Sequence, residues 1–293
     1  MIVTDPDWRA ALKKSSLSTV KAPTTVRVSM TRPAANDSSL TLHFVNYNRT
    51  EPAKKGSAGG GIVDEKPIAV MPGEAQELVE LAKQRGCCLQ VGHSERFNPV
   101  MALMRPHIKK PVFIECHRLS SFSERGTDVD VVLDLMIHDL DLVLSLNPGP
   151  VEEVRASGVA VLSSSIDIAH ARIQFQSGAV ANLTSSRVST NKMRRLRIFQ
   201  RDNYLSIDFQ TRQGMICRRS AEAGERPTVE VTNLQGGDEE PLKLQLESFL
   251  HAAGTGARPV VSGADGAAAV AVAHQVLQAI AAFASRIEEW PRG

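Results

Sequence analysis

The sequence is poor in cysteine. Its 293 residues include only Cys87, Cys88, Cys116 and Cys217, and no two of them form a C-x-x-C pair. Zinc sites and disulfide frameworks use several cysteines at characteristic spacings, so neither is expected here. The pattern is typical of reduced thiols, and we expect the side chains of Cys87 and Cys88 to pack in the buried core. This cysteine usage predicts a cytoplasmic location.

Long apolar runs and an excess of one charge are also missing. No apolar run reaches about 18 residues, so no transmembrane helix is expected. Residues 1–14 contain acids where a signal peptide has a basic start, and they lack its apolar stretch. The chain has 34 Lys and Arg against 32 Asp and Glu, a net charge of +2. This balance gives no reason to expect nucleic-acid binding. We therefore expect neither a membrane nor a nucleic-acid partner.

A glycine motif for binding phosphate is absent as well. Residues 56–61 read GSAGGG, but the glycines do not have the G-x-G-x-x-G spacing. Lys66 and Pro67 follow shortly after, where a helix would have to begin for its N-terminus to hold a pyrophosphate. We therefore predict that this stretch is a linker and not a phosphate site.

The residues that are present indicate a soluble globular chain whose character changes near residue 62. At about 150 residues per domain, the length suggests two domains. Residues 1–62 have a net charge of +5 and the remainder −3. Two candidate strands, at 26–30 and 40–47, flank a segment rich in turn residues. We predict that residues 1–62 form an atypical hairpin and linker segment.

Residues 63–97 are predicted to form part of a parallel α/β unit. Within 74–85 the apolar residues stand at positions 75, 78, 79 and 82, the spacing of an amphipathic helix. Gly86 ends this helix, and residues 88–92 are predicted to be a buried strand. With the apolar residues before the helix, this gives a strand–helix–strand crossover, which builds parallel sheets.

Residues 98–293 are predicted to form a second domain of the α+β type. Alternating apolar residues separated by turn signals indicate a large, mostly antiparallel open sheet. The predicted elements are a strand at 112–118, a helix at 128–146, five strands within 151–210, and helices at 241–254 and 265–287. The predicted fold class is therefore α/β, a partial parallel unit followed by this open-sheet domain.

The tripeptide Glu65-Lys66-Pro67 is the first candidate for chemistry. It follows a predicted strand, and ligands of open α/β sheets bind beyond the carboxyl ends of strands. A desolvated lysine there could act as an acid or base in a hydride transfer. The alternative is an ordinary Glu–Lys pair on the surface, and the tripeptide alone does not decide between them.

Asp134 and His138 are the second candidate. Their i, i+4 spacing places both side chains on one face of the predicted helix. A carboxylate beside an imidazole orients it and raises its pKa, which suits a general base that takes a hydroxyl proton. The alternative is a salt-bridged histidine on a solvated face. A metal site is not predicted, because no third ligand is close in sequence.

Three segments resemble the glucose-fructose oxidoreductase/inositol dehydrogenase/rhizopine catabolism (Gfo/Idh/MocA) family. They are EKPIAVMPGEAQELVELAKQRGCCLQVGHSERFNPV at 65–100, DVVLDLMIHDLDLVLSL at 130–146, and the closing segment from LQLESFLHAAG onward. The family's opening strand, G-x-G-x-x-G turn and helix have no counterpart in this sequence, so the chain resembles a member that lacks the N-terminal half of its Rossmann domain.

The resemblance implies an oxidoreductase that uses NAD or NADP to move a hydride at a hydroxyl carbon of a sugar, nucleotide sugar or cyclitol. It implies that His138 is the acid/base, that Asp134 is its partner, and that Lys66 contacts the substrate hydroxyl and the nicotinamide ribose. Glu65, Pro67 and Arg96 would lie near the cofactor. The resemblance also implies a homo-oligomer formed through the C-terminal sheet. The alternative is a catalytically inactive member that acts as an oligomerising or sugar-binding module.

A basic cluster at residues 192–201 remains to be explained. Arg195 and Arg197 alternate with apolar neighbours, as on a sheet with one solvated face. The other interpretation is attraction to an anionic substrate such as a nucleotide sugar. Arg118 and Arg125 precede the predicted catalytic helix and are weaker candidates for a substrate carboxylate or phosphate.

Overall fold

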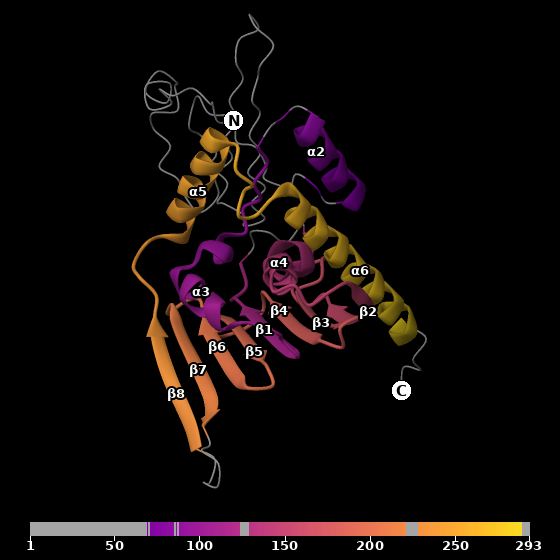
Figure 1. The fold of residues 1–293 in the computed structure, drawn as a ribbon. Helices are drawn as coiled ribbons and strands as arrows, with labels where there is room; N and C mark the ends of the chain where they lie inside the picture. The colour runs from indigo at the N-terminus through magenta and orange to yellow at the C-terminus, as the bar shows by residue number, and fades with distance from the viewer. Residues whose placement is uncertain are drawn as a thin grey trace, which may run out of the picture.

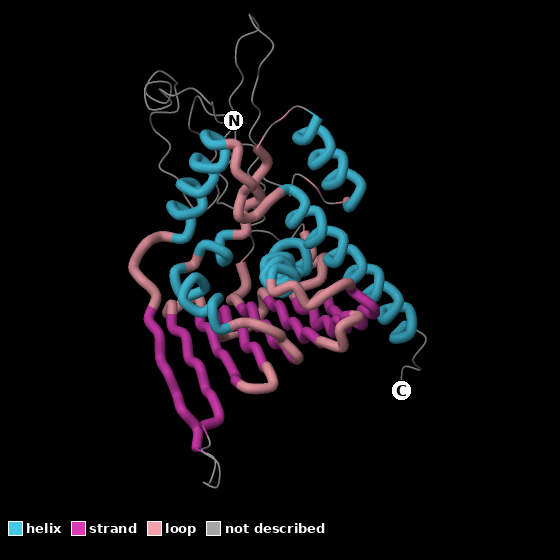
Figure 2. Tube along the Cα trace, in the orientation of Figure 1, coloured by secondary structure: helices cyan, strands magenta, loops and turns pink. Residues whose placement is uncertain are grey.

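The structure is a computed structural model that describes residues 69, 71–84, 86, 88–123, 129–220 and 228–288. Several predictions lie outside these residues: the hairpin and linker of residues 1–62, the tripeptide Glu65-Lys66-Pro67, and Arg125. The described part is built on an open sheet with helices above it (Figures 1 and 2).

The sheet has eight strands in the order β2-β3-β4-β1-β5-β6-β7-β8. Every neighbouring pair is antiparallel except β1 and β4, which run parallel. The strands are β1 Phe113–Leu119, β2 Val151–Val159, β3 Ile168–Phe175, β4 Val180–Ser186, β5 Met193–Phe199, β6 Asn203–Asp208, β7 Gln213–Ser220 and β8 Thr228–Gln235. This confirms the predicted open, mostly antiparallel sheet.

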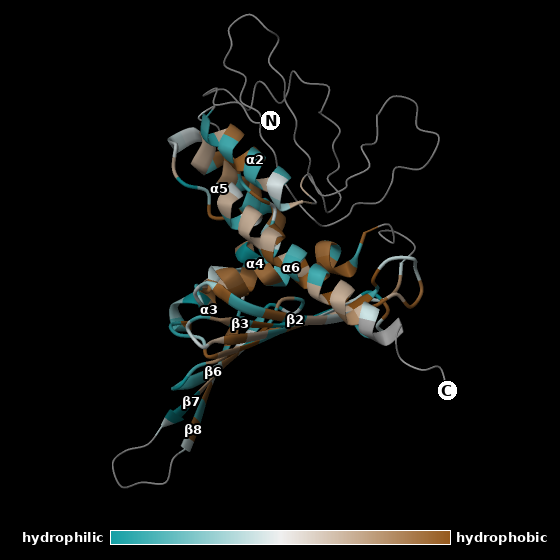
Figure 3. Cartoon of the chain, turned by 90° about the vertical axis from the view of Figure 1, so that its right-hand side faces the viewer, coloured by the Kyte–Doolittle hydropathy of each residue, from teal (hydrophilic) through white to brown (hydrophobic). Residues whose placement is uncertain are grey.

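The described helices all lie on one side of the sheet, and none covers the other face (Figure 3). The α-helices are α2 Pro72–Gln84, α3 Pro99–Met104, α4 Ile137–Ser145, α5 Pro241–Thr255 and α6 Gly263–Glu288. Two 3₁₀ helices, η1 Ser94–Phe97 and η2 Arg105–His107, flank α3, and a π-helix, η3 Val132–Met136, leads directly into α4.

The alternation of the strands explains why only one face is covered. In β1 the burial alternates, so that Ile114 and Cys116 are buried while Phe113 and Glu115 are half-buried on the opposite face. Successive side chains of a strand point to opposite faces, and each buried Leu, Ile or Val stabilises the fold by about 1.5–3 kcal/mol. The helices therefore pack on the face where the apolar side chains gather.

Four predictions differ from the structure. Cys88, which was predicted to be buried, is half-buried, and Cys87 lies outside the described residues. The predicted strand at 88–92 is reduced to an isolated bridge between Gln90 and Ser262. The predicted helix at 128–146 is shorter: it begins with the π-helix at Val132. Strands β7 and β8 were not predicted, because the residues of β8 are mostly exposed and therefore lack the apolar face that marks a strand.

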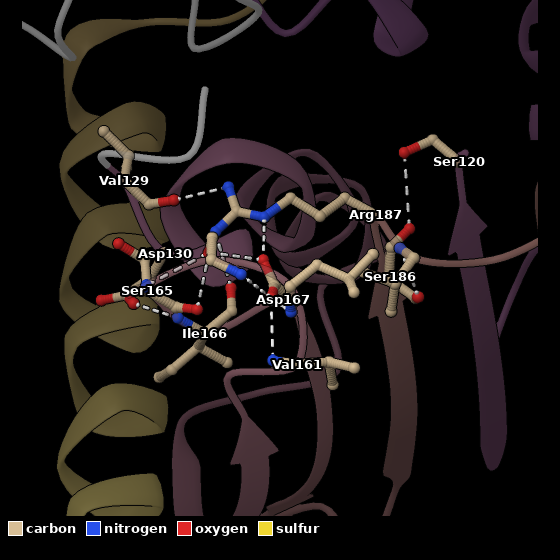
Figure 4. Close-up of polar contacts among 12 residues, drawn as sticks. Ser120, Val129, Asp130, Val161, Ser165, Ile166, Asp167, Ser186 and Arg187 are labelled. Atoms are coloured by element: carbon tan, nitrogen blue, oxygen red, sulfur yellow. Dashed lines mark hydrogen bonds and ion pairs between the residues drawn. The ribbon is translucent and has the colours of Figure 1, made fainter. Parts of the chain in front are cut away.

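A buried ion pair holds the loop between β2 and β3 against the segment that leads into η3 (Figure 4). Arg187 Nε lies 2.8 Å from Asp167 Oδ1, and both side chains are almost fully buried. Asp167 also accepts from the backbone N–H groups of residues 161–163. Arg187 donates to the carbonyls of Val129 and Ile166. The pair thereby fixes the segment that enters η3.

Helix α6 is long and apolar enough to cross a membrane by length and composition alone. In the structure it packs along α2, α4 and β2, beside the sheet (Figure 1). Val270, Ala273 and Val276 on this helix are fully buried. Burial of one stripe is typical of a helix that covers a core.

Candidate active site

His138 lies in the first turn of α4, immediately after the π-helix. Its side chain is 1% exposed, and Ile137, Leu140 and Leu142 beside it are fully buried. Most residues of α4 are buried, and the helix carries the polar imidazole of His138 into the core. A π-helical turn within a helix is often found at a functional site.

The Nδ1 atom of His138 faces a second buried histidine. His93, which precedes η1, has its Nδ1 atom 3.3 Å from Nδ1 of His138. The two rings meet edge to face, with an interplanar angle of 86° and centroids 5.3 Å apart. Two nitrogens at this distance share one proton, so one ring donates at Nδ1 and the other accepts.

The other ring nitrogen of His138 is available for chemistry. Nε2 is buried and has no hydrogen-bond partner among the residues that the structure describes. Burial lowers the pKa of His138 well below its usual 6.5, and Arg118, His93 and Arg194 lower it further. The imidazole is therefore neutral at pH 7. A neutral imidazole with an unbonded nitrogen can accept a proton, and unsatisfied buried groups are often functional.

Asp134 lies half-buried within the π-helix, and its backbone N–H donates to the carbonyl of Asp130. The sequence predicts that its carboxylate raises the pKa of His138. That direction is wrong, because burial and neighbouring cations lower this pKa. The Nδ1 atom of the imidazole lies 3.3 Å from Nδ1 of His93.

Arg118 is held in a buried ion cluster beside this pair. Its Nη2 lies 2.8 Å from Asp139 Oδ1, and its Nη1 lies 3.3 Å from Glu95 Oε1. Burial alone would lower the pKa of Arg118, but Asp139 and Glu95 outweigh burial and raise it. The cluster joins β1, η1 and α4. This arrangement favours a structural role over the predicted contact of Arg118 with a substrate anion.

Arg194 on β5 is the neighbour of Arg118 that reaches solvent. Its side chain is 52% exposed, and its Nη1 lies 3.5 Å from Glu95 Oε1. Arg195 and Arg197 project to the face without helices, where they pair with Asp208 and Glu115. The basic cluster is thus divided. Two of its members lie on the open face, and Arg194 lies on the same side of the sheet as His138.

The guanidinium of Arg96, in η1, makes two contacts within the protein. Its Nη2 donates to the carbonyl of Val260 at 3.0 Å, and its Nη1 lies 3.9 Å from Oδ1 of Asp141. These contacts fix η1 to the loop before α6. The predicted position of Arg96 near a cofactor stays a prediction, as do the roles of Lys66 and its neighbours outside the described residues. Among the described residues, no group of three or more His, Cys, Asp or Glu could hold a metal ion.

Sequence reasoning missed His93, Glu95 and Asp139. His93 and Glu95 stand in the same GHSERFNP turn as Arg96, which was singled out, and Asp139 directly follows His138. Spacing could not reveal the contact between His93 and His138, because 45 positions separate them. The only available signal was that polar residues occur within an otherwise apolar helix and turn.

The chain is similar to known proteins over most of its length. The family model for the GFO/IDH/MocA C-terminal domain matches residues 109–205. UDP-N-acetylglucosamine 3-dehydrogenase from Acidithiobacillus ferrooxidans is 36% identical over 233 residues, which cover 78% of this chain and 74% of that protein. Myo-inositol 2-dehydrogenase from Thermotoga maritima is 22% identical over 226 residues, which cover 72% of this chain and 67% of that protein.

Solved structures agree with this relationship. The structure of the Acidithiobacillus ferrooxidans enzyme superimposes with a TM-score of 0.69, over 74% of this chain and 70% of that chain. Levoglucosan dehydrogenase in complex with NADH has a TM-score of 0.63 at 15% identity, over 73% of this chain and 69% of that chain, which shows a shared fold. The open, mostly antiparallel sheet matches the C-terminal domain of Gfo/Idh/MocA dehydrogenases. The chain belongs to the Gfo/Idh/MocA family of oxidoreductases.

Proposed function

We propose that this chain transfers a hydride between NAD or NADP and a hydroxyl carbon of a sugar, with a nucleotide sugar as the preferred substrate class and a cyclitol as the alternative. One observation carries the proposal: the neutral, buried His138 with its unbonded Nε2 atom. A relative at 36% identity is named for its action on UDP-N-acetylglucosamine, which supports the substrate class.

Oxidation of an alcohol by a nicotinamide cofactor needs a base beside the hydroxyl group, and the unbonded Nε2 atom of His138 fits that role. When bound, the cofactor accepts or supplies the hydride. Glu65, Lys66 and Pro67 would hold its nicotinamide end, with Arg96 nearby. The sequence has no G-x-G-x-x-G motif for the pyrophosphate. The affinity for the dinucleotide is therefore the first quantity to measure.

His138 would act as the acid/base. In the oxidation direction Nε2 takes the hydroxyl proton while the carbon loses a hydride and becomes a carbonyl carbon. In the reduction direction the imidazolium returns that proton to the oxygen. Lys66 would contact the same hydroxyl group. Asp134, four residues before His138, would be the partner of the imidazole. The apolar residues around His138 exclude water, which strengthens each of these interactions.

The first experiment is a titration of the purified full chain with NADH and NADPH, followed by nicotinamide fluorescence or calorimetry. Saturable binding is expected, and incubation with UDP-N-acetylglucosamine and the preferred oxidised cofactor should then raise the absorbance of the reduced nicotinamide. Myo-inositol is the comparison substrate. A chain that melts cooperatively yet binds neither cofactor would contradict the proposal and favour the inactive, oligomerising or sugar-binding alternative.

Arg194 supplies a test of the anionic substrate. Its half-exposed guanidinium lies on the same side of the sheet as His138, where it could pair with a phosphate. Arg194→Ala is expected to raise KM for UDP-N-acetylglucosamine about tenfold and to change kcat little, because a charge-assisted hydrogen bond is worth about 1.5–3 kcal/mol. Arg155→Ala, at an exposed site on β2, is the matched control. An unchanged KM in Arg194→Ala would argue against this contact.

The uncovered face of the sheet is the proposed contact for a homo-oligomer. Phe113, Phe199 and Tyr204 form an aromatic row on this face, with ring centroids 5.5 and 4.8 Å apart. No described helix covers them. Sedimentation of the full chain measures the state of association.

A further inference from the structure

We propose that His93 is a positioning residue that fixes the tautomer of His138, so that His138 donates its Nδ1 proton to Nδ1 of His93 and keeps Nε2 unprotonated. The inference rests on the proposed function, in which Nε2 is the base. The distance of 3.3 Å between the Nδ1 atoms of the two buried rings carries it.

The shared proton allows only two arrangements while both rings are neutral. If His93 donates, the proton of His138 must be on Nε2, and the ring cannot take a proton from a substrate. If His138 donates, Nε2 carries a lone pair and can act as the base. A neutral imidazole has one N–H and one acceptor nitrogen, so no third arrangement preserves the hydrogen bond. The direction of one hydrogen bond therefore decides whether His138 is a competent base.

The surrounding charges favour donation by His138. On the side of β1 and β5, Arg118 and Arg194 act on His138. On the side of α4 and α6, the buried Asp141 is the strongest charge acting on His93, with Asp265 weaker and Arg96 and Arg118 opposing both. Cations near His138 favour a lone pair at its Nε2 atom, and an anion near His93 favours placing proton density toward that ring. Both effects favour a proton on Nδ1 of His138 and a lone pair on Nδ1 of His93.

The arrangement also helps after proton transfer. When Nε2 of His138 has taken the hydroxyl proton, the ring is an imidazolium that still donates at Nδ1 to His93. Asp141, 1% exposed and with its Oδ2 atom without a hydrogen-bond partner among the described residues, acts on His93, the ring that accepts this hydrogen bond. A base oriented by a second group, which is backed by a third, follows the general logic of catalytic triads.

The test reads the tautomer directly by long-range ¹H–¹⁵N correlation of the full chain labelled with ¹⁵N-histidine. The His138 signal is assigned by its loss in His138→Ala. In the wild type, the proposal expects a protonated Nδ1 and an unprotonated Nε2 on His138. In His93→Leu, which has no acceptor, the signal should shift toward the Nε2–H form. His93→Asn places an amide oxygen near the original Nδ1 position and should restore the wild-type form.

Kinetics provide the second readout. His93→Leu is expected to lower kcat about 10²-fold while KM changes little, because the base is misoriented and substrate contacts are intact. His93→Asn should recover most of this loss. His251→Leu, on the exposed face of α5, is the matched control and should behave as the wild type. A wild-type His138 protonated at Nε2 would overturn the proposal, whether or not the chain oxidises a sugar. The expected tautomer in a chain without activity would instead contradict only the proposed function.

Discussion

Replacement of His138 by alanine is expected to lower kcat about 10²–10⁴-fold, the usual contribution of a general acid/base. The substitution removes the nitrogen that is proposed to take the hydroxyl proton and leaves the residues proposed to contact the cofactor unchanged. Steady-state oxidation of UDP-N-acetylglucosamine measures the effect, and cofactor affinity from the fluorescence titration should remain near the wild-type value. Because the side chain is buried, a thermal melt must accompany the assay.

His251→Ala is the control for this variant, because His251 is exposed on α5. If His138→Ala folds, binds the cofactor and retains the wild-type turnover, then His138 is not the acid/base. Loss of both cofactor binding and activity would point to a structural defect. His138→Gln, which preserves more of the side-chain volume, would then separate loss of the acid/base from loss of packing.

The depressed pKa of His138 has its own signature in the pH profile. The pKa lies well below 6.5, first because of burial and then because of Arg118. The acid limb of kcat/KM is therefore expected below pH 6.5, where the imidazole of the free, folded chain takes a proton. The unfolded chain binds that proton near pH 6.5, so this group removes stability as the pH falls below that value.

Removal of the buried partner of Arg187 is expected to cause the largest loss of stability. Asp167→Ala should cost about 3–5 kcal/mol, because it removes a buried carboxylate that pairs with a buried guanidinium. The expected result is a markedly lower denaturation midpoint in urea or on heating. Activity should fall as well, since Arg187 and the adjacent loop fix the segment that enters η3.

A matched control lies on β2. Arg155 Nε and Glu153 Oε1 are also 2.8 Å apart, but their side chains are 75% and 47% exposed. Glu153→Ala should cost no more than about 1 kcal/mol, the usual range for a surface pair. Equal losses in the two variants would show that burial does not determine the strength of the Asp167–Arg187 pair.

The pH dependence of the two pairs should differ too. Burial alone would raise the pKa of Asp167, but hydrogen bonds from Ser163, the backbone N–H of Leu162 and Arg187 outweigh burial and lower it. Its stabilising contribution is therefore complete above the usual aspartate pKa of 3.8 and is lost as the pH falls below that value. Asp167→Ala should abolish this part of the acid sensitivity.

The strands between residues 112 and 210 were predictable because their alternation follows from burial of one face. Ile114 and Cys116 face the core while their neighbours do not, and this pattern is visible in the sequence. Strand β8 has no such contrast, since Val229 and Val231 are exposed along with the residues between them. Residues 88–92 have the apolar character of a buried strand, but their strand pairing is limited to the bridge between Gln90 and Ser262.

The site was predictable only in part. His138 could be found because a polar residue within an apolar helix is unusual. Its pKa could not, because that depends on Arg118 and Arg194 on two different strands. His93 was equally inaccessible, since only the fold brings the GHSERFNP turn against α4. Local patterns predict elements, whereas electrostatics depends on contacts between distant segments.

The position of β1 has a consequence for the order of folding. Strands β2 to β4 and β5 to β8 are two meanders of chain neighbours, and β1 alone joins them by lying between β4 and β5. Within each meander, paired strands follow one another along the chain, whereas pairing of β1 with β4 must first bridge a helix and two strands, which costs more entropy. We therefore expect insertion of β1 to come late. Because β1 carries Arg118, the ion cluster beside His138 forms only when the two meanders become one cooperative unit.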